Sequence, residues 1–263
     1  MQLEHREDVR EMRRLRSLTL CWLVVALSSS LLITSGGCSK GGSKDKAPFY
    51  KWLDVGFTFD RNMDNCGSIK VRTQAKGTSI SPGGKFGKAC RFAGNATFKI
   101  DDLRVPNEGT WALWFRLDRD ANLQQEMRII DANHYRFSIL EGRLNLFFHD
   151  GQWRSHSTTE QMTPREWVHA AMTWSQDEVR FYVNGMLVRT RPYSGAPTKR
   201  VCAPVVGARW TGSGNGFKGD IDELLIYGRA LAVEEIIALQ TSGLNEAQTP
   251  EYIVSTREEV TLE

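Results

Sequence analysis

The sequence predicts an all-β fold in which two antiparallel sheets pack as a sandwich. Short runs of alternating apolar and polar residues recur along the chain, which is typical of strands with one buried face. Turn sequences such as Glu141-Gly142, Asp150-Gly151 and Asn184-Gly185 separate the runs, and Asn-Gly suits the type I′ turn of a two-residue hairpin. Only Val233–Leu239 has the spacing of a helix. Many short strands joined by turns favour a sandwich with one short C-terminal helix.

The expected strands begin at Leu53 and end at Tyr227. In the first of them, every second residue from Leu53 to Phe59 is apolar, so these side chains share one face. The strands expected after it are Ala89–Phe92, Thr97–Ile100, Thr110–Leu117, Arg128–Asp131, Arg136–Ile139, Arg143–Phe148, Trp167–Trp174, Val179–Val183 and Gly219–Tyr227. The helix has Ala232 at its expected N-cap, and alanine there forgoes a capping hydrogen bond of about 1 kcal/mol.

Composition and charge describe an ordinary globular protein. The chain has 263 residues, of which 41% are hydrophobic and 25% are charged, and its net charge is +3. A single β-sandwich can reach roughly 200–250 residues, so the length fits one domain with extensions. Basic residues are scattered over the globular part, whereas a nucleic-acid-binding protein would show a clustered basic face. We therefore expect no nucleic-acid partner.

The N-terminal region has the features of a targeting segment. Arginines within 13–16 precede an uncharged stretch, Leu18–Ile33, that is followed by small residues, as in a secretory signal. The segment Ile33-Thr34-Ser35-Gly36-Gly37-Cys38 resembles a bacterial lipobox, with Ser35 in place of the usual Leu. The resemblance implies lipidation of Cys38 and an extracytoplasmic protein anchored to a bacterial outer membrane or cell surface. An uncleaved anchor is the alternative, since the stretch is near the shortest that spans a bilayer.

Four segments then organise the chain. Residues 1–37 form an N-terminal extension and signal peptide, and residues 38–48 form a polar tether rich in Gly, Ser and Lys. Residues 49–244 form the globular domain, and residues 245–263 form a flexible tail with few aromatic residues.

Sequence motifs along the domain appear in a recognisable order. They are Phe57–Asp60, Asp64–Gly67, Gly84–Phe92, Trp111–Leu117, Trp167–Trp174, Val179–Gly185, Gly219–Tyr227 and Arg229-Ala230-Leu231. Over residues 50–240 this series resembles the laminin-G-like jellyroll domains of the concanavalin A-like lectin/glucanase superfamily. The resemblance implies a jellyroll sandwich and leaves the function open, because one fold hosts many functions.

Glucanases of this superfamily carry three acidic residues on one strand. The nearest pattern here is Asp220-Ile221-Asp222-Glu223, in which Asp220 and Asp222 share a face and Glu223 points the other way. Leu225 occupies the position of the third acid. Because two carboxylates must flank a scissile sugar bond, we expect no enzyme, and a divergent glycoside hydrolase is the least favoured function.

Asp222 lies on the strand face that the pattern assigns to the core. A buried carboxylate needs a partner. Arg229 or backbone N–H groups of a neighbouring loop are the favoured partners, and a structural Ca²⁺ ion is the alternative. Some members of the superfamily hold calcium near the opening acidic turn, so Asp60, Asp64 and Asp222 are the candidate ligands.

The globular domain contains Cys66, Cys90 and Cys202. An extracytoplasmic setting permits one disulfide and leaves one thiol over. Cys66 and Cys90 flank the same early strands, which makes them the predicted pair. Three separate thiols are the alternative.

Trp153 and Trp210 lie in predicted loops beside polar residues, Gln152 and Asn215 among them. An exposed ring can stack on a sugar while polar neighbours bond its hydroxyl groups; alternatively, each ring packs over its own hairpin. We predict a non-catalytic, lipid-anchored module that recognises a glycan through these residues. A domain that binds a protein partner in adhesion is the second interpretation.

Overall fold

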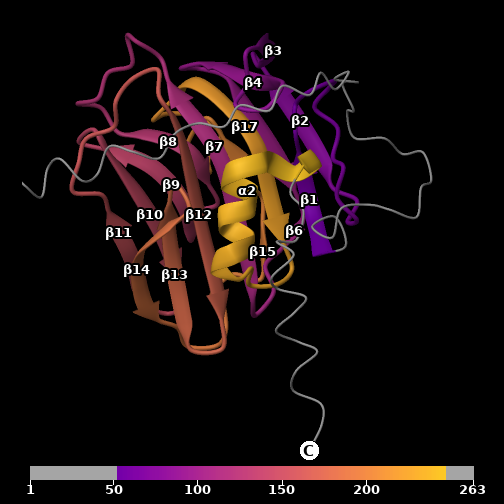
Figure 1. The fold of residues 1–263 in the computed structure, drawn as a ribbon, viewed down its shortest axis with the longest axis vertical. Coiled ribbons are helices and arrows are strands. Elements are labelled where there is room, and N and C mark those ends of the chain that lie inside the picture. The colour runs from indigo at the N-terminus through magenta and orange to yellow at the C-terminus, as the bar shows by residue number, and fades with distance from the viewer. Residues whose placement is uncertain (1–51, 247–263) are drawn as a thin grey trace, which may run out of the picture. The chain divides into compact units, whose positions relative to one another are not determined.

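The computed structural model describes residues 52–246, which form a sandwich of two large antiparallel sheets (Figure 1). This confirms the predicted all-β fold class. The predicted signal peptide, Cys38 and the tether lie outside the described residues, as do residues 247–263 of the predicted tail. Within 52–246, no helix has the length and apolar character needed to cross a bilayer.

The larger sheet has eight strands, and β17 pairs in it with β7 on one side and with β1 and β4 on the other. Its strands are β14 (Met186–Pro192), β13 (Glu178–Val183), β12 (Trp167–Ser175), β7 (Gly109–Leu117), β17 (Lys218–Tyr227), β1 (Leu53–Phe57), β4 (Lys88–Ala93) and β3 (Ser79–Pro82). The β13–β14 hairpin has its predicted turn, with φ 49° at Asn184 and 79° at Gly185.

The second sheet has seven strands. In spatial order they are β11 (Trp153–Ser157), β10 (Arg143–His149), β9 (Tyr135–Leu140), β8 (Met127–Asp131), β16 (Val205–Val206), β5 (Thr97–Asp101) and β2 (Arg72–Lys76). A small third sheet joins β15 (Val201–Cys202) to β6 (Leu103–Arg104).

The main apolar core lies between the two large sheets. Trp111 meets Tyr135 across it with ring centroids 5.8 Å apart, and Trp174 meets Phe148 at 5.2 Å. Burying side chains of this size contributes about 1.5–3 kcal/mol each. The alternating runs of the sequence therefore determine which face of each strand turns inward.

The helix α2 (Val233–Glu246) lies on the outer face of the eight-stranded sheet (Figure 1). Its Ile236 and Leu239 build a second apolar cluster with residues of β7, β12 and β17. The helix was expected to end at Leu239, but it continues through a break at Gly243, where φ is 64°. Leu244 explains the extension, because it is fully buried in the same cluster.

Arg229 and Glu235 fix the start of this helix. Arg229 Nη1 and Nη2 donate to Glu235 at 2.7 and 2.6 Å, and Glu235 also accepts the Ala232 N–H at 2.9 Å. Glu235 thus supplies half of a capping box, although Ala232 itself offers no acceptor. The predicted pairing of Arg229 with Asp222 was wrong because Glu235 binds the guanidinium.

A β-bulge interrupts β17 after Asp222, and Glu223 in the bulge has φ 48°. Leu224 and Ile226 beyond the bulge belong to the main core. Asp222 and Glu223 lie on the outer face, Asp222 beneath the loop around Phe86 and Glu223 beneath α2. The prediction that Asp222 shares the core face was therefore wrong. Asp222 is nonetheless fully buried, and Glu223 is also buried, accepting the Leu244 N–H at 2.7 Å.

No disulfide joins Cys66, Cys90 and Cys202, so the predicted Cys66–Cys90 bond is not formed. The eight-stranded sheet separates the two residues. Cys90 lies in the main core, while Cys66 packs against the outer cluster beneath α2. Proximity to the same strands was a poor guide, because alternate residues of a strand point to opposite faces.

Candidate functional site

The outer face of the seven-stranded sheet carries three rows of side chains across β11, β10, β9 and β8. Residues paired across neighbouring strands share a face, so the pairing register defines the rows. They are Trp153–His149, then Ser155–Phe147–Arg136–Asp131, then Ser157–Asn145–Ser138–Arg128. We call this surface the polar face. The residues between these rows, Phe137 and Leu146 among them, point into the core.

Arg136 and Phe147 form the centre of the polar face. The Arg136 guanidinium carbon lies 4.3 Å from the centroid of the Phe147 ring, in cation–π geometry. Burial lowers the pKa of Arg136, with nearby Arg128 adding to the effect. Its Nε is buried and has no hydrogen-bond partner among the described residues. An unmade buried hydrogen bond costs about 1–3 kcal/mol, so an oxygen atom from a ligand would be favoured there.

The third row adds hydroxyl and amide groups. Ser138 Oγ is fully buried and likewise makes no hydrogen bond within 52–246. Asn145 lies on one side of Ser138 and donates to Ser157 Oγ at 2.7 Å. Arg128 lies on the other side of Ser138 and binds Glu126 at 2.9 Å. Hydroxyl and amide groups of this kind both donate and accept, as the hydroxyl groups of a ligand require.

Trp153 stands at the edge of the polar face. Its ring centroid lies 4.0 Å from that of His149 and 4.8 Å from that of Phe147, yet 64% of the residue is exposed. His149 is held in turn by Thr198, with 2.9 Å between Nδ1 and Oγ1. The ring therefore packs partly over its own hairpin, as the alternative predicted, and leaves most of its surface to solvent.

The other predicted ligand-binding residues occupy two separate places. Gln152 is exposed in the turn before Trp153. Trp210 is 47% exposed in the loop after β16, and Asn215 in that loop donates to Glu126 O at 3.2 Å beside a cavity of about 350 Å³. Three strands separate β11 from β16, a distance of roughly 19 Å at the usual strand spacing. The strand order therefore keeps Trp153 and Trp210 apart.

Arg136, Ser138 and Phe147 were not among the residues predicted from the sequence. Their outward positions follow from the alternation in two predicted strands, Arg136–Ile139 and Arg143–Phe148. The core-facing residues of these strands are Phe137, Ile139, Leu144, Leu146 and Phe148. The sequence could therefore have indicated these residues through their outward positions in predicted strands. The pairing register was needed to show that residues of three strands form one surface.

The acidic residues of β17 are placed differently from a glycosidase site. Asp222 accepts the Phe86 N–H at 3.0 Å and the Glu223 N–H at 2.8 Å, so the prediction of backbone N–H partners was correct. Burial raises the pKa of Asp222 to about 9. Asp220 pairs with Arg116 at 2.9 Å. The Asp222 carboxyl thus lies beneath the loop around Phe86, with backbone N–H groups as its partners.

The candidate calcium ligands do not form one site. Asp60 Oδ1 accepts the Lys88 N–H at 3.0 Å, while Asp64 is exposed and bonds Asn62 at 2.6 Å. No group of three or more His, Cys, Asp or Glu residues within 52–246 has the arrangement of a metal site. Asp60 and Asp222 instead hold the backbone of the loop around Phe86.

The described residues define the class of protein: a lectin-like β-sandwich whose seven-stranded sheet presents a polar face edged by an exposed tryptophan. The chain belongs to the concanavalin A-like lectin/glucanases superfamily, because the laminin-G-like family model of that description matches residues 91–237, more than half of the chain. This confirms the resemblance seen in the sequence. No curated protein sequence matches the chain.

Solved structures share the fold at low identity. The receptor-binding domain of botulinum neurotoxin D has a TM-score of 0.61 and 12% identity, covering 73% of this chain and 52% of its own. Domain 4 of AbnA, an extracellular arabinanase from Geobacillus stearothermophilus, was solved with arabinotriose. It has a TM-score of 0.57 and 21% identity, and the match covers 75% of this chain and 100% of the AbnA domain. The binding domain of botulinum neurotoxin DC, solved with rat synaptotagmin II, has a TM-score of 0.60 and 11% identity. The match covers 73% of this chain and 52% of the neurotoxin domain. The chain spans about half the length of the neurotoxin domains. These relatives are binding domains of glycans or proteins.

Proposed function

We propose that the protein is a non-catalytic glycan-binding module whose binding site is the polar face. The observation that carries the proposal is the combination of exposed Trp153 with the buried, unpartnered polar atoms of Arg136 and Ser138. A sugar ring has an apolar face that can stack on indole and hydroxyl groups that can satisfy those atoms. The arabinotriose complex of AbnA domain 4 supports a saccharide as the ligand class.

Affinity electrophoresis of the full-length protein in gels containing arabinan, xylan or β-glucan tests this proposal. We expect retention by at least one polysaccharide, and Trp153→Ala should weaken it about tenfold, because stacking contributes about 0.5–1.5 kcal/mol beyond the buried area. Trp52→Ala is the matched control, since Trp52 is 50% exposed outside the polar face. Equal losses from the two substitutions would show that Trp153 has no special role.

A protein partner is the second candidate, because a distinct apolar surface favours it. Leu187 on β14 pairs with Tyr182 of the outer apolar cluster, and Leu187 and Ile237 on α2 are both exposed. The turn at Gly185 lies against α2 beside Ile237. Exposed apolar groups that gather in one place mark many protein interfaces. Binding of a protein that Leu187→Ser and Ile237→Ser abolish, with no polysaccharide retention, would favour this function over glycan recognition.

We also propose that the module is anchored to a bacterial membrane through a lipid on Cys38, on the outer membrane or the cell surface. The arginine-led signal pattern and the lipobox-like residues before Cys38 support this. Mass spectrometry of the mature N-terminus should find a lipidated Cys38, and Cys38→Ser should release the protein from the membrane fraction. A mature peptide that retains residues before Cys38 would contradict the proposal.

A further inference from the structure

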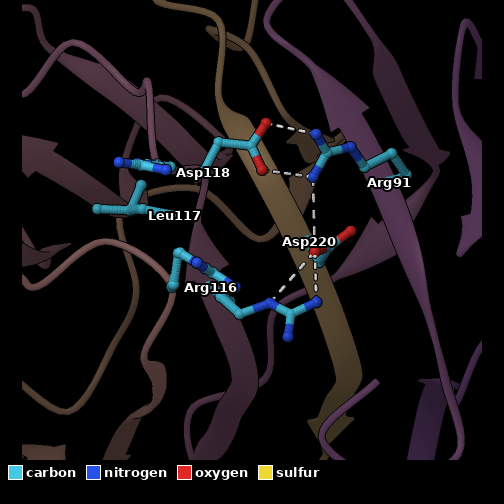
Figure 2. Close-up of a pocket in the computed structure, with 7 residues that line it drawn as sticks. Arg91, Arg116, Leu117, Asp118 and Asp220 are labelled. Carbon is cyan, nitrogen blue, oxygen red and sulfur yellow. Dashed lines mark hydrogen bonds and ion pairs between the residues drawn. The ribbon is translucent and has the colours of Figure 1, made fainter. Parts of the chain in front are cut away.

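A pocket rich in arginine lies on the eight-stranded sheet, whereas the polar face belongs to the seven-stranded sheet. Figure 2 shows residues that line this pocket. It has a volume of about 270 Å³, close to the lower end for small-ligand sites. Its lining residues are Arg91, Arg116, Leu117, Asp118, Arg119, Arg165 and Asp220. We call it the arginine pocket. It draws side chains from β4, β7 and β17 and from the segments that follow β7 and precede β12.

The inner arginines of the pocket are held in place by carboxylates. Arg91 makes a two-pronged pair with Asp118, and Arg116 binds Asp220 at 2.9 Å (Figure 2). The Arg116 guanidinium also lies 4.7 Å from the centroid of the Trp167 ring. Guanidinium groups fixed in this way lose little side-chain entropy when a ligand binds.

The outer arginines of the pocket leave a positive charge that the pocket itself does not balance. Arg119 and Arg165 are exposed, and neither side chain forms a salt bridge with a residue in 52–246. The backbone still holds Arg165 at the pocket, because its N–H donates to Leu117 O at 2.8 Å and its φ is 73°. Four arginines against two aspartates leave a charge of +2 in the pocket.

Asp220 adds a second, different requirement. Its Oδ2 binds Arg116, while its Oδ1 is buried and accepts no hydrogen bond from the part of the chain that is described. Only a donor such as a hydroxyl group can satisfy that oxygen. A ligand for this pocket should therefore carry an oxoanion for the arginines and a hydroxyl group for Asp220.

We infer that the arginine pocket binds an acidic saccharide, through a carboxylate or sulfate group on Arg119 and Arg165 and a neighbouring hydroxyl group on Asp220. Arginine forks suit such oxoanions because they donate two parallel hydrogen bonds. The polar face and this pocket lie on different sheets, so the inference does not depend on the proposed function.

Isothermal titration calorimetry of the full-length protein tests the inference. The probes are trigalacturonate and its methyl ester, and sulfated maltotriose and maltotriose itself, so that each acid has a neutral counterpart. We expect one or both acids to bind more tightly than their counterparts, and Arg119→Gln with Arg165→Gln to weaken that binding about tenfold or more. The two acids distinguish a carboxylate from a sulfate source.

A charge-matched control is Arg104→Gln with Arg200→Gln, which removes two exposed arginines that do not line the pocket. It should change acid binding less than about twofold, because distant surface charges are screened by salt. Trp153→Ala should leave acid binding unchanged, which separates this pocket from the polar face. Equal binding of acids and neutral sugars, or equal losses from the two arginine double variants, would overturn the inference.

Discussion

Two buried groups on the outer face of the eight-stranded sheet should shape how stability depends on pH. Burial raises the pKa of Asp222 from 3.8 to about 9, and neighbouring Glu223 adds to the effect while backbone donors oppose it. Burial also lowers the pKa of His169 from 6.5 to about 3, with nearby Lys85 contributing. Asp222 accepts the Phe86 N–H, and His169 contacts Trp114, whose ring meets that of Phe86, so both groups lie near the loop around Phe86.

The two shifts act on stability with opposite signs. The contribution of Asp222 is full below about pH 4 and is lost as the pH rises toward 9, because the folded carboxyl keeps its proton. The contribution of His169 is full above about pH 6.5 and is lost as the pH falls toward 3. Each slope is about 1.4 kcal/mol per pH unit. Between about pH 4 and 6.5 the two contributions to the free energy of unfolding offset each other. From about pH 6.5 to 9 only the contribution of Asp222 changes with pH.

Urea denaturation of the full-length protein at pH 5, 6.5, 7.5 and 8.5 would measure this. The free energy of unfolding should fall by about 3 kcal/mol between pH 6.5 and 8.5, at about 1.4 kcal/mol per unit. Asp222→Asn should flatten that decline, because an amide cannot ionise. Asp64→Asn, which alters an exposed carboxyl, should keep the wild-type slope. Parallel curves for wild type and Asp222→Asn would refute the assignment.

Two further substitutions test how the cover over this sheet is fixed. Glu235→Ala should lower the free energy of unfolding in urea by about 2 kcal/mol, since it removes the ion pair with Arg229 and the cap at Ala232; a similar loss from Glu234→Ala would contradict this. Gly87→Ala places a Cβ 2.0 Å from Asp60 Oδ1, whereas Gly83→Ala, also at positive φ, meets nothing within 4 Å. Gly87→Ala should therefore lower the melting temperature more, and equal decreases would show that Asp60 can move aside.

The strands that the sequence predicted are those that bury an apolar face. The sequence from Thr110 to Leu117 is almost continuously apolar, and β7 is buried at nearly every position. By contrast, β2 reads Arg-Thr-Gln-Ala-Lys, and all five of its residues are exposed. It is an edge strand held by pairing with β5, so it has no burial pattern to read.

The bulge in β17 shows why the candidate site could be predicted only in part. A single extra residue reverses the faces of everything after it, so strict alternation placed Asp222 on the wrong side. Trp153 was recognisable because a large ring in a polar hairpin is conspicuous. Its partners Phe147 and Arg136 come from β10 and β9, and only the pairing register places them beside it.

The outer faces of the two large sheets hold their polar groups in different ways. On the eight-stranded sheet, α2 and the loop around Phe86 cover the middle of β7 and β17, so the buried carboxyls of Asp222 and Glu223 hold backbone groups. Beyond that cover, arginines gather at the end of β17 near Asp220. The seven-stranded sheet has its polar groups aligned in rows beside an exposed indole. Under the two proposals, a neutral sugar would bind the polar face and an acidic sugar the arginine pocket, so a polysaccharide with both kinds of residue would engage both sheets.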